Sequence, residues 1–357
     1  MKRGLWPVGV VGALIAAAYV SLVMSRAAWD PTVMLAEGVQ AQPQLEYAED
    51  MLGRKVAARP ELGHDGRFFF ILANDPFLLS PENHAVHLDL PTYRAQRILY
   101  PLLGGGFGLF GATATVWGLI AVNVLAAGFG SLAASAIGRM LGASRWLGLA
   151  FIINPGVIAE LDIDGGGVVA LALGLIGLYL LVRERQPWAV ASLTSAVLAR
   201  ETMLLFVVGL VLWAWRTRKS FRPALLLIPA AAAIVWRLYS GNRLDSIEPD
   251  ALQVEGLLRS FDLVPLRGAL RGLDLWTGTE VLWTLCLVAI LLLFVRRAWK
   301  SRAAVAWGTW PFAILSLFLS VVVWLEPYDI ARAIAPIFVA YPLLLFAKGS
   351  SEASEVR

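Results

Sequence analysis

The chain alternates long apolar segments with short basic clusters along almost its whole length. Residues 5–24 form one apolar stretch of about 20 residues, the length at which a helix crosses the hydrocarbon core of a bilayer. The MSRAAW segment that follows is a poor signal-peptide cleavage site, so we expect an uncleaved first helix. A return helix is expected near residues 112–137. The pattern predicts an all-α integral membrane protein.

The basic clusters indicate how the helices are oriented. Because Lys and Arg concentrate in short cytoplasmic loops, each segment between two clusters must leave the cytoplasm and return. We therefore expect hairpins over residues 146–182, 187–215, 223–295 and 303–346. With the first pair of helices, this gives about ten crossings and cytoplasmic termini. The clusters are Lys2-Arg3; Arg139 and Arg145; Arg183 and Arg185; Arg216, Arg218, Lys219 and Arg222; Arg296, Arg297, Lys300 and Arg302; and Lys348.

The connections between these helices are expected on the outer side. The first loop, residues 24–98, and a second polar loop, residues 239–275, are the longest. Shorter breaks are expected at ELDIDGGG (160–167), at Arg200-Glu201 and in WLEPYDIARA (324–333). Several crossings would then have only about 12–15 residues, which is tolerated where a helix is buried in protein or lines a wet cavity. We expect a single membrane domain, residues 1–357, with a cavity in the outer leaflet.

Composition supports the membrane assignment, since 58% of the residues are hydrophobic, 16% are charged and the mean hydropathy is +0.68. A soluble domain has about 25% charged residues. The net charge of +4 does not indicate nucleic-acid binding, because the basic residues already have a topological explanation. Of 26 acidic residues, only Glu184, Glu352 and Glu355 fall on the predicted inner side. The chemistry-bearing groups therefore gather on the outer face.

The stretch HDGRFFFILANDPF (64–77) is the densest polar cluster next to an apolar run. Asp65 can cap a helix by accepting from free backbone N–H groups. Phe68, Phe69 and Leu72 then share one face, and Pro76 disfavours helix at the residue before it. The spacing predicts a short amphipathic helix in the outer interface, an arrangement that by itself needs no chemistry.

The same stretch resembles a known family signature. The pattern H/W-D-G-x-x-F/Y-x-x-x-A is similar to the first-loop motif of the GT-C superfamily of multipass glycosyltransferases, nearest to PIG-V-type mannosyltransferases and related bacterial proteins. The following HLDLPTYRAQRILYPLL (87–103) resembles the continuation of that loop. Two departures are His64, where tryptophan is common, and Asp75-Pro76, where Gly-Tyr is common. The matching residues are Asp65, Gly66, Phe69, Phe70, Ile71, Leu72 and Ala73.

The resemblance implies an inverting transferase that takes a sugar from a polyprenyl-phosphate donor and passes it to an outer-face acceptor, which could be a glycan, a lipid or a protein. Asp65 would be the base that removes the proton of the acceptor hydroxyl. Arg94 and Arg97, three positions apart, present donors suited to phosphate, although interfacial snorkelling also explains them. Arg332 is a third candidate for the phosphate, or a simple partner of Asp329.

Further polar residues are candidates for the cavity wall or for contact with the acceptor. Arg200 and Glu201 stand out because ionisable residues near membrane depth are costly and often functional, and the adjacent pair can partly neutralise itself. His84, His87 and Asp89 could ligate a divalent cation, but a hydrogen-bond network is favoured and no cofactor is expected. The candidate residues are His64, Arg67, Asp75, Asp89, Tyr93, Asp162, Asp164, Arg200 and Glu201.

Two other classes of function remain open from the residues alone. A transporter or lipid flippase usually spreads polar groups through the membrane depth, often in two related halves, whereas here they gather at one face without a visible repeat. A non-catalytic partner in the assembly of envelope glycopolymers is the other alternative. The single cysteine, Cys286, excludes a disulfide within the chain.

Overall fold

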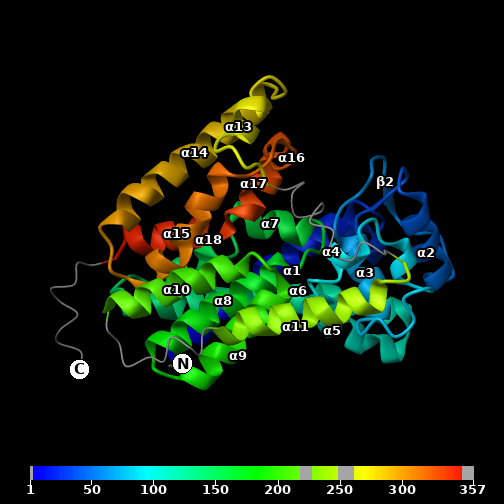
Figure 1. The fold of residues 1–357 in the computed structure, drawn as a ribbon, viewed down its shortest axis with the longest axis horizontal. Coiled ribbons are helices and arrows are strands. Elements are labelled where there is room, and N and C mark those ends of the chain that lie inside the picture. The colour runs from blue at the N-terminus through cyan, green and yellow to red at the C-terminus, as the bar shows by residue number, and fades with distance from the viewer. Residues whose placement is uncertain (1–2, 218–226, 248–260, 348–357) are drawn as a thin grey trace.

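The structure, a computed structural model, describes residues 3–217, 227–247 and 261–347. Helices dominate the described part of the chain, which confirms the predicted all-α class (Figure 1). The described strands, β1 (Glu37–Gly38) and β2 (Ala58–Arg59), form one short parallel pair inside the first loop.

The first helix and its return partner lie side by side. Helix α1 (Trp6–Ser25) follows the turn η1 (Arg3–Leu5), and α6 (Ala112–Met140) covers the predicted return segment. Small residues line their contact: a Cβ at Gly12 would lie 2.7 Å from Cβ of Ser131. Such residues let two backbones approach closely where apolar burial gives no driving force between helices.

Three helices among the described residues are long and apolar enough to cross a membrane, namely α1, α6 and α14 (Gly278–Trp299). A fourth crossing is possible if α17 (Pro327–Ala333) and α18 (Ala335–Leu345), which meet at a bend of 67°, form one span. The predicted ten crossings would therefore require shorter apolar helices to cross as well. These include α8 (Gly167–Val182), α10 (Met203–Thr217) and α15 (Ala304–Leu317).

The predicted polar breaks interrupt the helices where expected. After the turn η5 (Arg145–Ala150), α7 (Pro155–Asp162) ends just before the glycine run, and α8 begins within it. Helix α9 (Gln186–Ala199) ends just before Arg200, and α10 begins at Met203. The final break contains α16 (Val321–Leu325) and α17. Each break carries charged side chains to one region of the fold.

The second polar loop begins later than predicted. Helix α11 (Leu227–Leu244) continues past position 239 because its last turns are held against the first loop. Tyr239 Oη donates to the carbonyl oxygen of Phe77 at 2.6 Å, and Arg243 Nε donates to that of Leu78 at 2.7 Å. Part of the predicted loop, residues 248–260, lies outside the described residues. The chain continues with α13 (Arg267–Gly272), which precedes α14.

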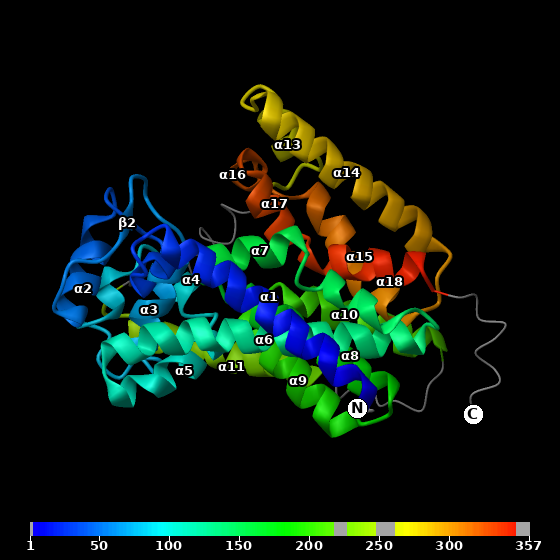
Figure 2. The same ribbon diagram turned by 180° about the vertical axis from the view of Figure 1, so that it is seen from behind.

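The first loop folds into a compact group of short elements. They gather at one end of the molecule, while α1 runs along α6 toward the other end (Figure 2). The elements are η2 (Pro31–Leu35), β1, α2 (Gln42–Leu52), β2, α3 (Gly66–Asn74), η3 (Ala85–His87) and α4 (Pro91–Arg94), followed by α5 (Leu99–Gly105) and η4 (Gly106–Phe110).

Helix α3, which carries the HDGRFFFILANDPF stretch, is a core helix rather than an interfacial one. Every residue from Gly66 to Ala73 is buried. Tyr47 of α2 packs on Phe70 with ring centroids 6.3 Å apart, and Tyr100 of α5 packs on Phe69 at 5.2 Å. The prediction of a helix ending before Pro76 is confirmed, but the prediction of a one-sided apolar face is wrong.

Candidate functional site

Asp65 lies at the start of α3, in a tightly packed position. The residue after it must be very small, because a Cβ at Gly66 would lie 2.8 Å from the carbonyl oxygen of Leu35 and 2.9 Å from that of Met34. The predicted capping role of Asp65 is wrong, since its carboxylate accepts no hydrogen bond from a free N–H of α3. The backbone there is already helical, which turns the side chain away from the helix end.

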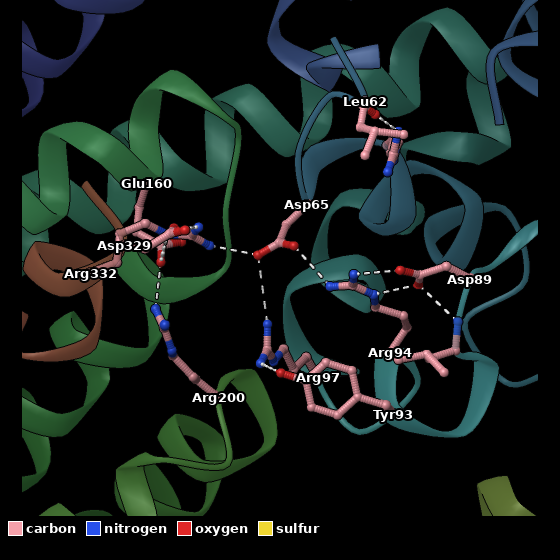
Figure 3. A network of polar contacts seen from close by, with 12 residues as sticks. Leu62, Asp65, Asp89, Tyr93, Arg94, Arg97, Glu160, Arg200, Asp329 and Arg332 are labelled. Carbon is pink, nitrogen blue, oxygen red and sulfur yellow. Dashed lines mark hydrogen bonds and ion pairs between the residues drawn. The ribbon is translucent and has the colours of Figure 1, made fainter. Parts of the chain in front are cut away.

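The Asp65 carboxylate instead faces three guanidinium groups. Arg94 Nη1 donates to Oδ1 at 2.8 Å, and Arg332 Nη2 donates to Oδ2 at 2.6 Å. Arg97 Nη1 lies 3.8 Å from Oδ2, as an ion pair without a hydrogen bond (Figure 3). The three arginines predicted to bind phosphate thus converge on the carboxylate predicted to be the base. We refer to these four residues as the Asp65 cluster.

Arg94 and Arg97 are each also bound by a second carboxylate, on the side away from Asp65. Arg94 donates to Asp89 through Nε at 2.8 Å and Nη2 at 2.9 Å. Arg97 donates to Glu201 through Nε at 2.9 Å and Nη2 at 2.8 Å. Two-point pairs of this kind fix the plane of a guanidinium as well as its position. The remaining donor of each group therefore points toward Asp65.

Arg332 is held in the same manner by two acids. Its Nε donates to Glu160 at 2.8 Å and its Nη1 donates to Asp329 at 2.9 Å. The i, i+3 pair with Asp329 was one of the two predicted explanations, and both it and the contact with Asp65 occur. Glu160, at 3% side-chain exposure, also accepts from Arg200 and from the backbone N–H of Gly167.

Glu160 was not among the predicted site residues, although the sequence carried a signal for it. It lies in a segment where Pro155-Gly156 and a glycine run flank eight apolar and acidic residues, about two helical turns. A Cβ at Gly167 would lie 2.7 Å from Glu160 Oε1, so a side chain there would displace the carboxylate. The glycines predicted to allow close approach thus admit a carboxylate that positions Arg332.

Arg200 and Glu201 form their direct ion pairs with other residues, although the charge of Arg200 still helps to lower the pKa of Glu201, as the predicted partial neutralisation implies. Arg200 turns to Glu160 and Glu201 turns to Arg97. The reason is the helix break between α9 and α10, where Arg200 is extended and successive side chains point in opposite directions. The break connects the first loop to α7 through two different ion pairs.

Aromatic side chains support the arginines. The guanidinium of Arg94 lies 3.9 Å from the ring centroid of Phe68, and Arg97 Nη2 donates to Tyr93 Oη at 2.6 Å. A guanidinium over an aromatic face is stabilised electrostatically by the ring. These contacts further limit how far either side chain can move.

The electrostatics of the cluster follow from these contacts. Burial alone would raise the pKa of Asp65, but the charges of Arg332, Arg94 and Arg97 outweigh it and hold the pKa well below its usual value. The same balance, with Arg94 as the cation, lowers the pKa of Asp89. Both carboxylates are ionised, and Asp65 in this arrangement is a weak base.

Four predicted cavity residues have other partners. Arg67 donates to the carbonyl oxygen of Leu62, and the Asp75 carboxylate accepts from the backbone N–H of Leu79 at 2.7 Å. Their positions are set by the first loop's own backbone. Asp162 accepts from Tyr19 Oη and Arg59 Nη2, each at 3.1 Å, and Asp164 accepts from Tyr100 Oη at 2.6 Å and Asn123 Nδ2 at 2.9 Å.

The histidines also fall outside the Asp65 cluster. Tyr47 Oη lies 2.7 Å from His84 Nδ1, and the ring of His87 lies against Tyr47 with centroids 4.9 Å apart. Asp89 is directed to Arg94 instead. No set of three or more His, Cys, Asp or Glu side chains in the described part of the chain is arranged to hold a metal ion. His64 is half-buried, and burial lowers its pKa.

A small cavity lies behind the cluster, next to Glu160, Arg200 and Arg332. Its volume is about 20 Å³, and its remaining wall is mainly apolar, including Met203 and Phe312. This is roughly the space that one water molecule needs. This cavity is therefore too small for a substrate.

No family model, curated protein or solved structure matches the chain. The function of the site must therefore be argued from its own geometry. That geometry consists of one partly exposed carboxylate and three arginines that face it, each fixed from behind by a further acid.

Proposed function

We propose that the chain is an inverting glycosyltransferase that moves a sugar from a polyprenyl-phosphate-linked donor to an extracytoplasmic acceptor. The observation that carries this proposal is the convergence of Arg94, Arg97 and Arg332 on Asp65. An anion site built from arginines suits a phosphate, and a carboxylate within it suits proton abstraction from a hydroxyl. The resemblance of the first loop to the GT-C motif supports the same roles.

In the proposed reaction the acceptor oxygen attacks the anomeric carbon of the donor. The bond from that carbon to the phosphate oxygen breaks, and the phosphate leaves on its polyprenyl chain. The hydroxyl proton passes to Asp65, and the arginines stabilise the charge that develops on the phosphate. The proposal assigns this stabilisation to the arginines and invokes no divalent cation.

The proposal places the site at the outer face of the cell membrane. In it, the shorter helices cross as the sequence predicts, to give about ten crossings with cytoplasmic termini. The three long apolar helices support a membrane location. The sugar of the donor and the identity of the acceptor, whether glycan, lipid or protein, are left to experiment.

The test is sugar transfer in purified membranes, from a panel of radiolabelled polyprenyl-phosphate sugars. Wild type is compared with Asp65→Asn at equal expression, and Asp50→Asn serves as the matched control because Asp50 is an exposed carboxylate in the same loop. We expect transfer from one donor class, a loss of at least about a hundredfold in Asp65→Asn, and unchanged transfer in Asp50→Asn. Absence of transfer from every donor would favour the transport and assembly alternatives instead.

A further inference from the structure

The arginine donors that point into the site are already occupied. Asp65 accepts from Arg94 and Arg332 at hydrogen-bond distance, with Arg97 close by. The cavity behind Arg332 has a volume of about 20 Å³, which is too small for a phosphate. A phosphate could reach the arginines only by sharing or taking the donors that Asp65 uses.

The arginines cannot simply retreat to make room. Arg94 and Arg97 are each held by a two-point pair, to Asp89 and to Glu201, and Arg332 is held by two acids. Turning Arg97 or Arg332 away would remove a cation from Glu201 or Glu160, whose side chains are 18% and 3% exposed, and this is destabilising. Asp65, at the centre, is held differently: Arg94 and Arg332 each give it one hydrogen bond, and neither forms a two-point pair with it. We therefore take Asp65 as the group that changes partners.

We propose that Asp65 is the resting occupant of a phosphate-binding site, and that the donor phosphate takes over the arginine donors from Asp65 when it binds. This inference rests on the proposed function and adds how the two groups share one site. Arg97 is the natural first contact for the phosphate, because its Nη1 lies 3.8 Å from Asp65 and forms no hydrogen bond to it.

The exchange makes the Asp65 carboxylate a stronger base when the donor binds. With its cations engaged by phosphate, Asp65 loses the interactions that favour its charged form, and its affinity for a proton rises. The free protein thus keeps a weak base, and the donor complex acquires a stronger one. A water molecule next to Asp65 in the free protein would therefore be deprotonated only weakly.

The charges balance through the whole cycle. Before transfer the site holds the Asp65 carboxylate and a phosphodiester, each with one negative charge. After transfer it holds a neutral carboxylic acid and a phosphate monoester that has gained the second charge. When Asp65 loses its proton, it competes again for the arginines and displaces the spent carrier.

The experiment measures binding of a polyprenyl phosphate without a sugar to the purified full-length protein. We compare wild type with Asp65→Asn, which keeps the shape of the side chain and removes its charge. If Asp65 blocks the site, the competent fraction of wild type is small, and the variant should bind at least about tenfold more tightly. Equal affinity of wild type and variant would overturn the proposal.

The matched control is Asp89→Asn. It also removes one negative charge next to Arg94, but from behind the guanidinium. We expect it to bind the carrier no more tightly than wild type does. If Asp89→Asn gained as much affinity as Asp65→Asn, net charge rather than exchange would explain the result, and the proposal would fail. Asp65→Ser repeats the test should Asp65→Asn not fold.

The binding test of the exchange and the transfer test of the glycosyltransferase can fail independently of each other. Transfer by wild type without a gain of affinity in Asp65→Asn would retain the glycosyltransferase and reject the exchange. A gain of affinity without transfer from any donor would retain the phosphate site and its occupant, and reject the glycosyltransferase.

Discussion

Arg332 Nη2 donates to Asp65 Oδ2 at 2.6 Å, across 267 positions of sequence. The same guanidinium uses its other nitrogens to reach Glu160 and Asp329. One side chain near the end of the chain therefore connects the first loop, α7 and its own helix. This relationship makes Arg332 the residue whose replacement tests the site most directly.

We expect Arg332→Ala to reduce transfer by at least about a hundredfold and to destabilise the protein by about 3 kcal/mol, because Glu160 and Asp65 each lose one of their cations. Arg332→Lys should behave almost as badly, since one ammonium cannot reach three acids that a guanidinium holds in different directions. Transfer rates and thermal melting in detergent measure the two effects. Arg54→Ala, which breaks a partly exposed pair with Asp30 in the first loop, is the control and should stay within about 1 kcal/mol.

Gly66→Ala should prevent Asp65 from reaching its position. Its Cβ would meet three backbone oxygens, which cannot move as a side chain can. We predict low yield of folded protein, and loss of transfer in whatever folds. Gly106→Ala is the control, because Gly106 has open space around it and an ordinary helical backbone. Normal yield and transfer from Gly66→Ala would show that the close packing at this position is not required.

The free energy of unfolding should fall as the pH rises from about 4.5 to about 8, because the buried Glu37 carboxyl then loses its proton. This residue is 0% exposed, and neither oxygen of its carboxylate has a hydrogen-bond partner in the structure. Burial raises its pKa to about 8, against a smaller opposing effect of Arg67. Because the folded pKa lies above the unfolded one, the stabilising contribution is complete below the unfolded pKa and is lost as the pH approaches 8.

Glu37→Gln should remove most of this decline. Thermal melting at pH 5 and pH 8 measures it, and the expected gain of the variant over wild type at pH 8 is a few kcal/mol. Glu61→Gln, an exposed residue of the same loop, should keep the wild-type dependence. A decline of equal size in wild type and Glu37→Gln would assign it to another group.

The proposed orientation can be tested by labelling single cysteines in intact cells. In a Cys286→Ser background, Arg54→Cys should react with a membrane-impermeant maleimide, because the first loop is proposed to lie outside. Arg185→Cys and Lys300→Cys, at exposed positions between helices, should react only after the membrane is permeabilised. Labelling of Arg185→Cys before permeabilisation would contradict the prediction that each segment between two basic clusters leaves the cytoplasm and returns to it.

The long helices were predictable because their signal is local. An apolar run of spanning length specifies α1 or α6 without reference to the rest of the chain. The breaks were predictable for a similar reason, since charged residues and glycines interrupt apolar runs. The number of crossings was not fixed in this way, because helices of 14 to 16 residues are compatible with either a short span or a buried segment.

The sequence predicted which residues form the site better than it predicted which of them pair with each other. Asp65, Arg94, Arg97 and Arg332 stood out as charges in an apolar chain or through the family motif. The sequence does not show the long-range pairs, such as Arg97 with Glu201 and Arg332 with Asp65, because their members come from distant segments. The complete burial of α3 was not predicted for the same reason. Phe70 lies off the predicted apolar face, and Tyr47 of another helix covers it.

The distance along the chain between Asp65 and Arg332 also has a consequence for biosynthesis. A ribosome adds roughly 5–20 residues per second, so about 15–50 seconds separate the synthesis of the two residues. Throughout that interval the nascent protein has the first loop but not the arginine that completes it. A prematurely terminated chain would thus retain the carboxylate and lack the site.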